Sequence, residues 1–400
     1  MTPNIGIFTY STKPRGSVVH AACLGEALAD EGADVTLYAL AKSGDDFFRP
    51  LRCRLVLLPA APANAGSEEL VAQRIAEVQH GLAALGPRHD VYHAEDCLTA
   101  SALVSAVPAR SPVVRTVHHV ERFTSPYLAA CQRRSIEASE LVLSVSKRTA
   151  REVMSEFGRA SRLVHNGVDV SRFEATDALP PALAGQLGLA PDDVVVLSVG
   201  GVEERKNALL ALDAMSGALA GNRRLRWVVV GGASIWDHGE LERRFDATVA
   251  ALPEGVRRRV ARVGTVDEAT LNWLYQRSDI LLCPSLHEGW GLCALEALAA
   301  GTSVVASDQE PFTEFLDGGV ACLIDPKSIV AIQGAVLALA ADPARRARLA
   351  QAGRERARRF SWQRAAVAHL EAYASLRGAR QTSVPSLALP ANSFPLSVGV

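Results

Sequence analysis

Short runs of apolar, mostly β-branched residues alternate along this chain with longer segments of helical periodicity. In the first half, the predicted strands begin near residues 4, 34, 54, 90, 113, 141 and 162. Helical patterns lie between most of them, as in Val18–Glu31, Ser67–Leu85 and Lys147–Phe157. Strands that alternate with helices in this way predict a parallel sheet with crossover helices.

A second series of the same kind follows a segment at 175–191 that is rich in Ala, Pro, Leu and Gly and is typical of a linker. Its predicted strands are Asp193–Val199, Arg226–Val230, Val260–Val263, Ile280–Cys283, Ser303–Ala306 and Ala321–Ile324. Helical patterns then continue from Ser328 to Arg377, and the residues after Gly378 show no periodicity. We therefore predict two parallel-sheet α/β domains that form a cleft, at 1–178 and 179–378, and a flexible tail at 379–400.

Composition narrows the function classes. With 48% hydrophobic and 21% charged residues, the 400-residue chain can bury two cores. The formal net charge of -1 gives no overall attraction to nucleic acid, so we expect no nucleic-acid partner. The seven cysteines are scattered, without a C-x-x-C pair, as is typical of a reducing compartment. The sequence begins without a signal-peptide pattern and has no apolar stretch of membrane-spanning length, so we expect a cytoplasmic protein.

We expect functional residues in the loops that follow strands, because parallel sheets bind ligands at the carboxyl ends of their strands. Gly16 lies between the first strand and the first helix, where backbone can approach an anion at a helix N-terminus. An ordinary βα turn would have the same spacing. His118 directly follows the strand near 113 and could donate a hydrogen bond to a substrate or share a proton. A structural histidine bonded to backbone is the alternative.

Two adjacent cations, Arg205 and Lys206, follow the first strand of the second series and precede a helix predicted to start near Asn207. Such a pair suits a diphosphate, because the guanidinium can contact two oxygens while the ammonium adds a point charge. The alternative is a solvated loop in which Glu203 and Glu204 neutralise the two cations.

The segment from Pro284 to Gly301 combines a strand end, a glycine-rich turn and a helix of almost only Ala and Leu. Glu296 lies inside that apolar helix, and Glu288 lies in the turn before it. A carboxylate in such surroundings needs hydrogen-bond partners. Sugar or ribose hydroxyls would serve, as would backbone or a basic side chain. An internal salt bridge is the alternative, although we expect it to explain only one of the two carboxylates.

The sequence contains no D-x-D triplet and no histidine or carboxylate cluster with metal-ligand spacing. We therefore expect no tightly bound metal and no other resident cofactor. The arginine-rich stretch Arg345–Arg359 predicts a solvated helix face, with a membrane-surface patch as the alternative.

The segment Pro284–Asp308 resembles the donor-binding block of the family 4 glycosyltransferases, with an E-x7-E motif at Glu288 and Glu296. Other segments similar to family motifs follow in the same order as in that family. They are the Gly16 loop leading to His20, Thr116-Val117-His118, Val145-Ser146, His165–Asp169, the glycine–Arg205-Lys206 loop and Gly264-Thr265-Val266. The family consists of retaining enzymes of GT-B fold. The resemblance therefore implies two Rossmann-like domains facing across a cleft, with a C-terminal helix that returns to the first domain.

The resemblance also implies roles for individual residues. Arg205 and Lys206 would bind the donor diphosphate together with backbone at Gly16. Glu296 would hold the nucleotide ribose, and Glu288 would contact hydroxyls of the transferred sugar. His118 would lie beside that sugar, near the reacting carbon. The implied donor site is completed by the backbone of Gly289, Trp290, Gly291 and Leu292 and by Gly264 and Val266. One departure is Gly201, which occupies the place of a family arginine, and Arg205 would supply the missing cation.

The implied function is metal-independent transfer of a hexose-type sugar from a nucleotide-diphosphate sugar, with retention. Its partners would be that donor and a sugar, lipid-linked or small-molecule acceptor. The sequence leaves open the acceptor, the oligomeric state and peripheral contact with the inner membrane face. Two alternatives remain: a nucleotide-sugar epimerase of the same fold, and a non-catalytic protein that binds sugar nucleotides.

Overall fold

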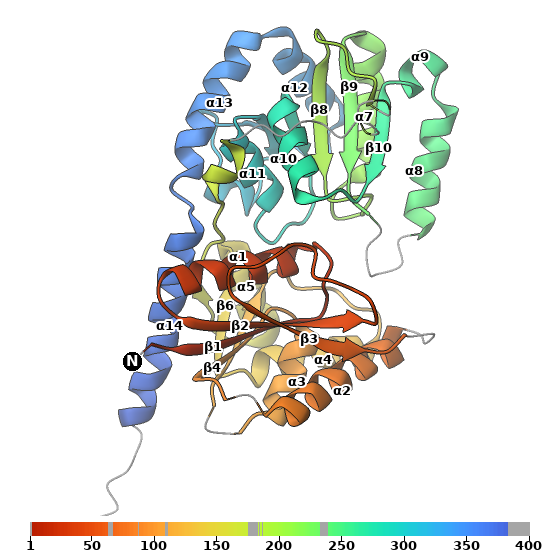
Figure 1. The fold of residues 1–400 in the computed structure, drawn as a ribbon. Coiled ribbons are helices and arrows are strands. Elements are labelled where there is room, and N and C mark those ends of the chain that lie inside the picture. The colour runs from red at the N-terminus through yellow and green to blue at the C-terminus, as the bar shows by residue number, and fades with distance from the viewer. Residues whose placement is uncertain are drawn as a thin grey trace, which may run out of the picture.

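A computed structural model describes residues 2–62, 67–86, 88–108, 111–174, 187–232 and 239–382, together with Leu183 and Gly185. The predicted linker at 175–191 lies mostly outside these residues, as does the predicted tail from 383 onward. Within them the chain forms two parallel sheets, one above the other in Figure 1, with helices on both faces of each. This arrangement confirms the predicted alternation of strands and helices.

The first sheet has the strand order β3-β2-β1-β4-β5-β6-β7. Its strands are β1 (Asn4–Thr9), β2 (Asp34–Lys42), β3 (Arg54–Ala60), β4 (Val91–Ala94), β5 (Val113–Val117), β6 (Leu141–Ser144) and β7 (Arg162–Leu163). The associated helices are α1 (Gly16–Asp30), α2 (Ser67–Leu85), α3 (Cys97–Ala106), α4 (Pro126–Glu137) and α5 (Lys147–Phe157). The direction of winding reverses between β1 and β4, since β1 pairs with both β2 and β4.

The second sheet has the order β10-β9-β8-β11-β12-β13. Its strands are β8 (Val194–Val199), β9 (Leu225–Val230), β10 (Val260–Gly264), β11 (Ile280–Cys283), β12 (Ser303–Ser307) and β13 (Cys322–Ile324). The helices around it are α7 (Ala208–Gly221), α8 (Gly239–Ala251), α9 (Glu254–Arg257), α10 (Glu268–Arg277), α11 (Leu292–Ala300), α12 (Ile329–Ala341) and α13 (Pro343–Ala357). Here the reversal lies between β8 and β11, so each sheet has a switch point where ligands of such folds bind.

The second sheet is buried on both faces, which explains its continuous apolar strand patterns. In β8, Val195 and Leu197 belong to a core that includes residues of α10 and α11. Their neighbours Val194 and Val196 belong to the opposite core, with residues of α7 and α12. Successive strand residues point to opposite faces, so one apolar strand supplies both cores.

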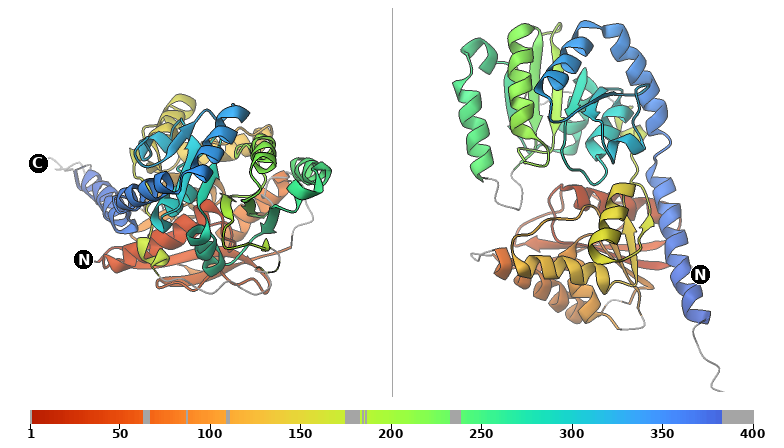
Figure 2. Two further views of the ribbon diagram at one scale, coloured as in Figure 1. Left: turned by 90° about the horizontal axis from the view of Figure 1, so that it is seen from above. Right: turned by 180° about the vertical axis from the view of Figure 1, so that it is seen from behind.

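The last helix, α14 (Trp362–Thr382), returns to the first domain and packs against α1. Figures 1 and 2 show α14 running along the side of the first domain, below α13, which lies beside the second. Trp362 and Tyr373 share a core cluster with Leu24 and Leu28 of α1. The predicted return of the C-terminal helix is therefore confirmed, and this helix extends beyond 379, where the tail was predicted to start. Within the described residues, no helix is apolar over a length sufficient to cross a membrane.

Two chain segments cross between the domains in close backbone contact. The Val168 N–H donates to the Phe360 carbonyl at 2.8 Å, and Val168 forms an isolated parallel bridge with Ser361. Gly167 lies directly against the second segment, because a Cβ at this position would be 2.2 Å from the Trp362 nitrogen. The turn at 165–169 thus joins the domains through a contact that only glycine permits.

Replacement of Gly167 by alanine should lower the free energy of unfolding by about 1–3 kcal/mol, because the new methyl group would overlap backbone atoms. Gly334→Ala is the control, since a Cβ at this exposed position of α12 meets no atom within 4 Å. We expect it to leave stability unchanged or raise it by up to about 1 kcal/mol. Urea denaturation followed by circular dichroism measures both, and equal stability of the two variants would contradict the close contact.

Candidate functional site

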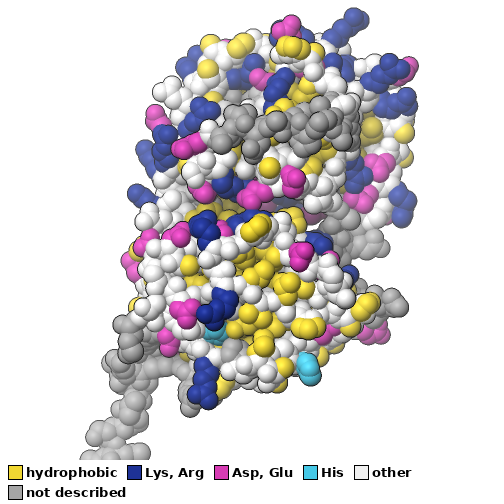
Figure 3. Space-filling model, in the orientation of Figure 1, with side chains coloured by type: hydrophobic (Ala, Val, Ile, Leu, Met, Phe, Trp, Pro, Cys, Tyr) yellow, Lys and Arg dark blue, Asp and Glu magenta, His cyan; other side chains and the backbone are white. Residues whose placement is uncertain are grey.

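The space-filling view shows a hollow between the two domains, with acidic and basic side chains along both sides (Figure 3). The domains meet there through two loops that follow strands. His118 follows β5 of the first domain, and Gly289 follows β11 of the second. A Cβ on Gly289 would lie 1.9 Å from the His118 carbonyl oxygen, so these backbones touch. The structure therefore brings His118 together with the loop that carries Glu288.

Arg205, Lys206 and Glu288 form one ion cluster. The Lys206 ammonium pairs closely with Oε1 of Glu288, and Arg205 Nη1 lies 3.3 Å from its Oε2. The hydroxyl of Ser285 donates to Oε1 at 3.1 Å. Arg205 also pairs with Glu203 at 2.7 Å, so part of the solvated-loop alternative applies as well. Three residues predicted as catalytic thus share a single charged site.

Electrostatics keep this cluster ionised. Burial alone would raise the pKa of Glu288, but Lys206 and Arg205 outweigh it and lower the pKa to about 2. Burial would likewise lower the pKa of Lys206, and Glu288 instead holds it above its ordinary value. Glu288 is only 7% exposed, so its charge depends on these cations rather than on water. An anionic ligand here would compete with Glu288 and Glu203 for the same N–H donors.

Glycines shape the loop that carries the two cations. Gly200 and Gly201 have φ values of 124° and 74°, which side-chain-bearing residues rarely adopt. A Cβ on Gly200 would also lie 2.9 Å from Cε of Lys206. Gly200 therefore leaves room for the lysine to fold back over the strand end, and Gly201 lets the loop pass against the Gly232 carbonyl.

Backbone bonds tie this loop to the end of β11. The carbonyl of Arg205 accepts from the N–H groups of Leu286 and His287 at 2.8 and 3.2 Å. Asn207, in the left-handed conformation, donates its side-chain amide to the carbonyls of Pro284 and Pro326 at 3.1 and 2.6 Å. Helix α7 begins directly after Asn207, as predicted. The cations and Glu288 are therefore placed by one rigid pair of loops.

Glu296 also has internal partners. Tyr275 donates its hydroxyl to Oε2 at 2.9 Å, and Arg172 approaches Oε1 at 3.5 Å. Burial raises the pKa of Glu296 although Arg172 opposes the effect. We expected an internal salt bridge to explain only one of the two carboxylates. That expectation was wrong, since both are paired with cations in this structure.

In the turn between the two carboxylates, Gly291 and Trp290 contact different neighbours. Gly291 has a φ of 93° and lies against Phe312, and no side chain caps the N-terminus of α11, which starts at Leu292. Trp290 is 3% exposed, and its ring stacks on His165 at 4.5 Å and packs against Phe315. The side chain of Trp290 therefore serves the joint between the domains, and only its backbone is left for the predicted donor contact.

The remaining predicted residues lie at strand or helix ends. Gly16 is the first residue of α1, which has no side-chain cap, and a Cβ there would meet no atom within 4 Å. Gly16 is exposed, so its helix N-terminus is open to an anion. Gly264 ends β10 with a φ of 67°, and Val266 lies two residues later, before α10. Among the described residues, no hydrogen bond or ion pair joins Gly264 or Val266 to the Glu288 cluster.

Glu95, which no sequence motif singled out, is fully buried and lies just beyond the end of β4. Its Oε2 lies 2.8 Å from Nε2 of His118 and 2.9 Å from Nδ1 of His20. The two imidazole rings stand edge to face, 4.7 Å apart. The available signal was a carboxylate directly after a predicted strand of a parallel sheet.

Within the described residues, Glu95, His20 and His118 are also close enough together to hold a metal ion. Their spacing nevertheless fits a zinc site poorly. Ligands of a tetrahedral zinc with bonds of about 2.0–2.2 Å would lie about 3.3 Å apart, which is longer than either contact to Glu95. Linear motif spacing had predicted no such cluster, and the absence of a tightly bound metal stays a prediction.

Comparison with known proteins identifies the family. The model of Glycosyltransferase Family 4 matches residues 14–172, and that of Glycosyl transferases group 1 matches residues 181–356. A D-inositol 3-phosphate glycosyltransferase of Xylanimonas cellulosilytica is 30% identical over 390 residues, covering 90% of this chain and 91% of that protein. The chain belongs to the group 1, family 4 glycosyltransferases. The resemblance seen in the sequence is confirmed, and with it the assignment to the glycosyltransferase class of enzymes.

Solved structures agree on the GT-B fold of this glycosyltransferase. A sucrose-phosphate synthase from Thermosynechococcus elongatus superposes with a TM-score of 0.76 at 22% identity, covering 95% of this chain and all of that one. HepE of Anabaena, solved with UDP and glucose, has a TM-score of 0.73 at 19% identity, covering 93% of this chain and all of that one. The predicted pair of Rossmann-like domains is therefore confirmed.

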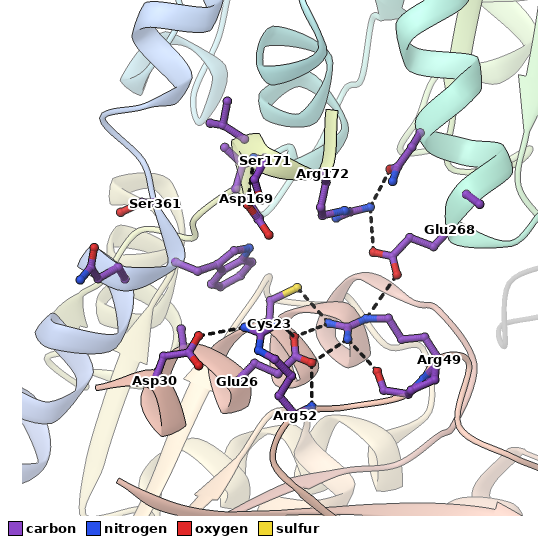
Figure 4. Close-up of a pocket in the computed structure, with 18 of the residues that line it drawn as sticks. Cys23, Glu26, Asp30, Arg49, Arg52, Asp169, Ser171, Arg172, Glu268 and Ser361 are labelled. Carbon is purple, nitrogen blue, oxygen red and sulfur yellow. Dashed lines mark hydrogen bonds and ion pairs between the residues drawn. The ribbon is translucent and has the colours of Figure 1, made fainter. Parts of the chain in front are cut away.

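A cavity of about 1030 Å³ lies beside the joint of this glycosyltransferase, between α1, η1 (Val170–Phe173), α10 and α14 (Figure 4). Arg49 binds Glu26 at 2.8 Å and approaches Glu268 at 3.5 Å, and Arg172 binds Glu268 at 2.9 Å. None of the predicted site residues is among the described residues that line it. Through Arg172, however, this row of ion pairs connects the first domain to Glu296.

Replacement of Glu288 by glutamine should destabilise the glycosyltransferase by about 3 kcal/mol at pH 7, because two buried cations lose their counter-ion. The folded-state pKa of about 2 is below the ordinary 4.5, so the carboxylate stabilises the fold above pH 4.5. That contribution is lost as the pH falls toward 2. The difference in the free energy of unfolding between the wild type and the variant should therefore decrease over this range.

Urea denaturation at several pH values measures this difference. Glu254→Gln is the control, because the pair of Glu254 with Arg258 is exposed and should contribute less than about 1 kcal/mol at any pH. A difference for Glu288→Gln that stays constant from pH 4.5 to 2 would contradict the ion cluster.

Proposed function

We propose that this glycosyltransferase moves a hexose from a nucleotide-diphosphate sugar to an acceptor, with retention of anomeric configuration and without a metal ion. The observation that carries the proposal is the cluster of Arg205, Lys206 and Glu288 facing His118 across the domain contact. In this cluster, Arg205 and Lys206 would bind a diphosphate, and the Glu288 carboxylate would accept hydrogen bonds from sugar hydroxyls. HepE, which shares the fold, was solved with UDP-glucose, and this supports UDP-glucose as the first donor to assay.

The cations would act on the leaving group. As the bond from the anomeric carbon to the diphosphate oxygen breaks, negative charge grows on the diphosphate, where Arg205, Lys206 and the N-terminus of α1 at Gly16 stabilise it. Because these groups are held by loop bonds and not by solvent, little reorganisation is needed during the reaction. They would perform the charge stabilisation that a metal ion supplies elsewhere.

The new glycosidic bond would form on the same face of the sugar. The acceptor oxygen bonds to the anomeric carbon as the diphosphate departs, and the acceptor's proton passes to a leaving phosphate oxygen. Glu95, the carboxylate behind His118, is fully buried against imidazoles and cannot reach the anomeric carbon as a nucleophile. This placement favours direct same-face substitution over a covalent sugar–enzyme intermediate.

The remaining predicted residues would contact other parts of the donor. Glu296 would accept bonds from the ribose hydroxyls, the amides of Gly289–Leu292 would bind the sugar or phosphate, and Gly264 and Val266 would line the nucleotide. The epimerase and the non-catalytic alternatives are not favoured, because the relatives are named as a glycosyltransferase and a glycogen synthase. The acceptor is left open, and the name of the relative in Xylanimonas makes D-inositol 3-phosphate one compound for an acceptor panel.

UDP-glucose at 100 times its Kd should stabilise the protein by about 2.7 kcal/mol, since a ligand of the folded state raises apparent stability. A thermal-shift series with UDP-, GDP- and ADP-glucose measures the effect, and equal shifts for all three would argue against a UDP donor. The same shifts and turnover should persist in EDTA. Loss of turnover in EDTA that added Mg²⁺ or Mn²⁺ restores would overturn the metal-independent mechanism.

Arg205→Ala combined with Lys206→Ala should abolish transfer, at least 100-fold in kcat/KM, and remove the thermal shift with UDP. The loss of two charge-assisted contacts to the diphosphate is the cause. Arg243→Ala with Arg258→Ala is the matched control, because these two arginines are about three-quarters exposed on α8 and beside α9. Near-normal transfer by the first pair in a donor-hydrolysis and acceptor assay would refute the assigned clamp.

A further inference from the structure

A buried carboxylate with two imidazoles on one oxygen lies directly behind the proposed reaction centre. Oε2 of Glu95 contacts His118 and His20 at 2.8 and 2.9 Å, and the exposed fractions of the Glu95 and His20 side chains are 0% and 1%. The proposed transfer uses neither of these two residues directly. They come from β4 and α1, whereas His118 follows β5.

The contacts determine which ring nitrogen of His118 carries the proton. Burial would raise the pKa of Glu95, but the imidazole of His20 and the hydrogen bond from His118 hold it well below the ordinary value, so the carboxylate is anionic. Burial lowers the pKa of His118 to about 4, so its ring is neutral at pH 7 and has one N–H. That N–H must be at Nε2, since an anionic oxygen at 2.8 Å can only accept.

The other nitrogen, Nδ1, is therefore a hydrogen-bond acceptor. Among the described residues it has no hydrogen-bond partner, and the His118 side chain is 13% exposed. The backbone of the same residue touches Gly289, next to Glu288. An acceptor at this place suits a hydroxyl of the transferred sugar.

Further residues hold Glu95 from behind. His93 lies 3.7 Å from Oε1, and its two nitrogens bond the hydroxyls of Tyr373 and Thr116, both at 2.7 Å. The ring of His20 packs edge to face on Trp362 at 5.3 Å. Helix α14, which supplies Tyr373 and Trp362, thus supports the carboxylate through side chains that never touch His118.

We propose that Glu95 is a positioning residue for the transfer: it fixes the ring of His118 with the proton on Nε2, so that Nδ1 accepts a hydroxyl of the donor sugar. The expected effect on sugar transfer rests on the proposed function, but the tautomer of His118 is a property of the protein alone. It assigns Glu95 no contact with substrate.

The tautomer is measured first, by long-range ¹H–¹⁵N correlation on protein labelled in its histidines, with His118 assigned from a His118→Asn variant. We expect the Nε2–H form of His118 in the wild type. In Glu95→Ala the ring loses its anionic partner and should show a mixture of both tautomers. Glu95→Gln keeps an acceptor oxygen without the charge and should restore the Nε2–H form in part.

Kinetics then separate positioning from folding. Glu95→Ala should lower kcat by about 10- to 100-fold, as loss of an orienting carboxylate does at metal-bound histidines. The thermal shift with UDP should stay largely unchanged, because Arg205 and Lys206, the two cations proposed to bind its diphosphate, lie in the other domain. Glu95→Gln should recover part of kcat. Ser139→Ala is the control: it removes a buried hydrogen bond to the Ser135 carbonyl, outside this network, and should leave both the tautomer and kcat unchanged.

A wild-type spectrum with His118 protonated on Nδ1 would overturn the inference, as would wild-type kcat in Glu95→Ala. A wild type that binds and turns over no sugar nucleotide would instead overturn the proposed function, and the spectrum would still decide the tautomer.

Discussion

The pairing of Lys206 with Glu288 is the constraint on which the rest of the site depends. Both side chains are mostly buried, and neither charge could stay there without the other. The pair demands a loop with two left-handed glycines, an asparagine that binds two carbonyls and a backbone bridge from Arg205 to Leu286. These features together place two cations at a strand end with little freedom to move, as stabilisation of a leaving group requires.

Neither domain alone contains all the residues of the proposed site. The second domain holds the cations and the Glu-x7-Glu helix, and the first holds His118 and the buried Glu95. The two halves meet where Gly289 touches the His118 carbonyl and where Val168 pairs with Ser361. Glycine stands at both close approaches, at 289 and 167. The position of the reacting groups across the gap therefore depends on backbone contacts at the joint and not on long side chains.

Charge is divided between the two halves in a way that suits the proposed transfer. The diphosphate, which gains negative charge, would lie against Arg205 and Lys206. The sugar ring, which gains positive charge, would lie nearer to His118, with the anionic Glu95 one imidazole behind it. The row of ion pairs from Arg49 through Glu268 and Arg172 reaches Glu296 from the side of the joint between the domains. The proposed donor site is thus connected to the first domain on two sides.

The sequence by itself determined the alternation of strands and helices, the two sheets and the strand-end loops that carry Arg205, Lys206 and Glu288. These follow from local periodicity and from glycines, which act over a few residues. Only the tertiary structure decided that Glu288 pairs with both cations, that Arg172 reaches Glu296 across 124 positions, and that Trp290 turns toward His165. Glu95 and His20 meet because β4 lies beside β1 in the sheet, and strand order is set by how the sheet packs as a whole. Local sequence patterns do not encode strand order. They could place residues at the carboxyl ends of strands, but they could not tell which of these residues would contact each other.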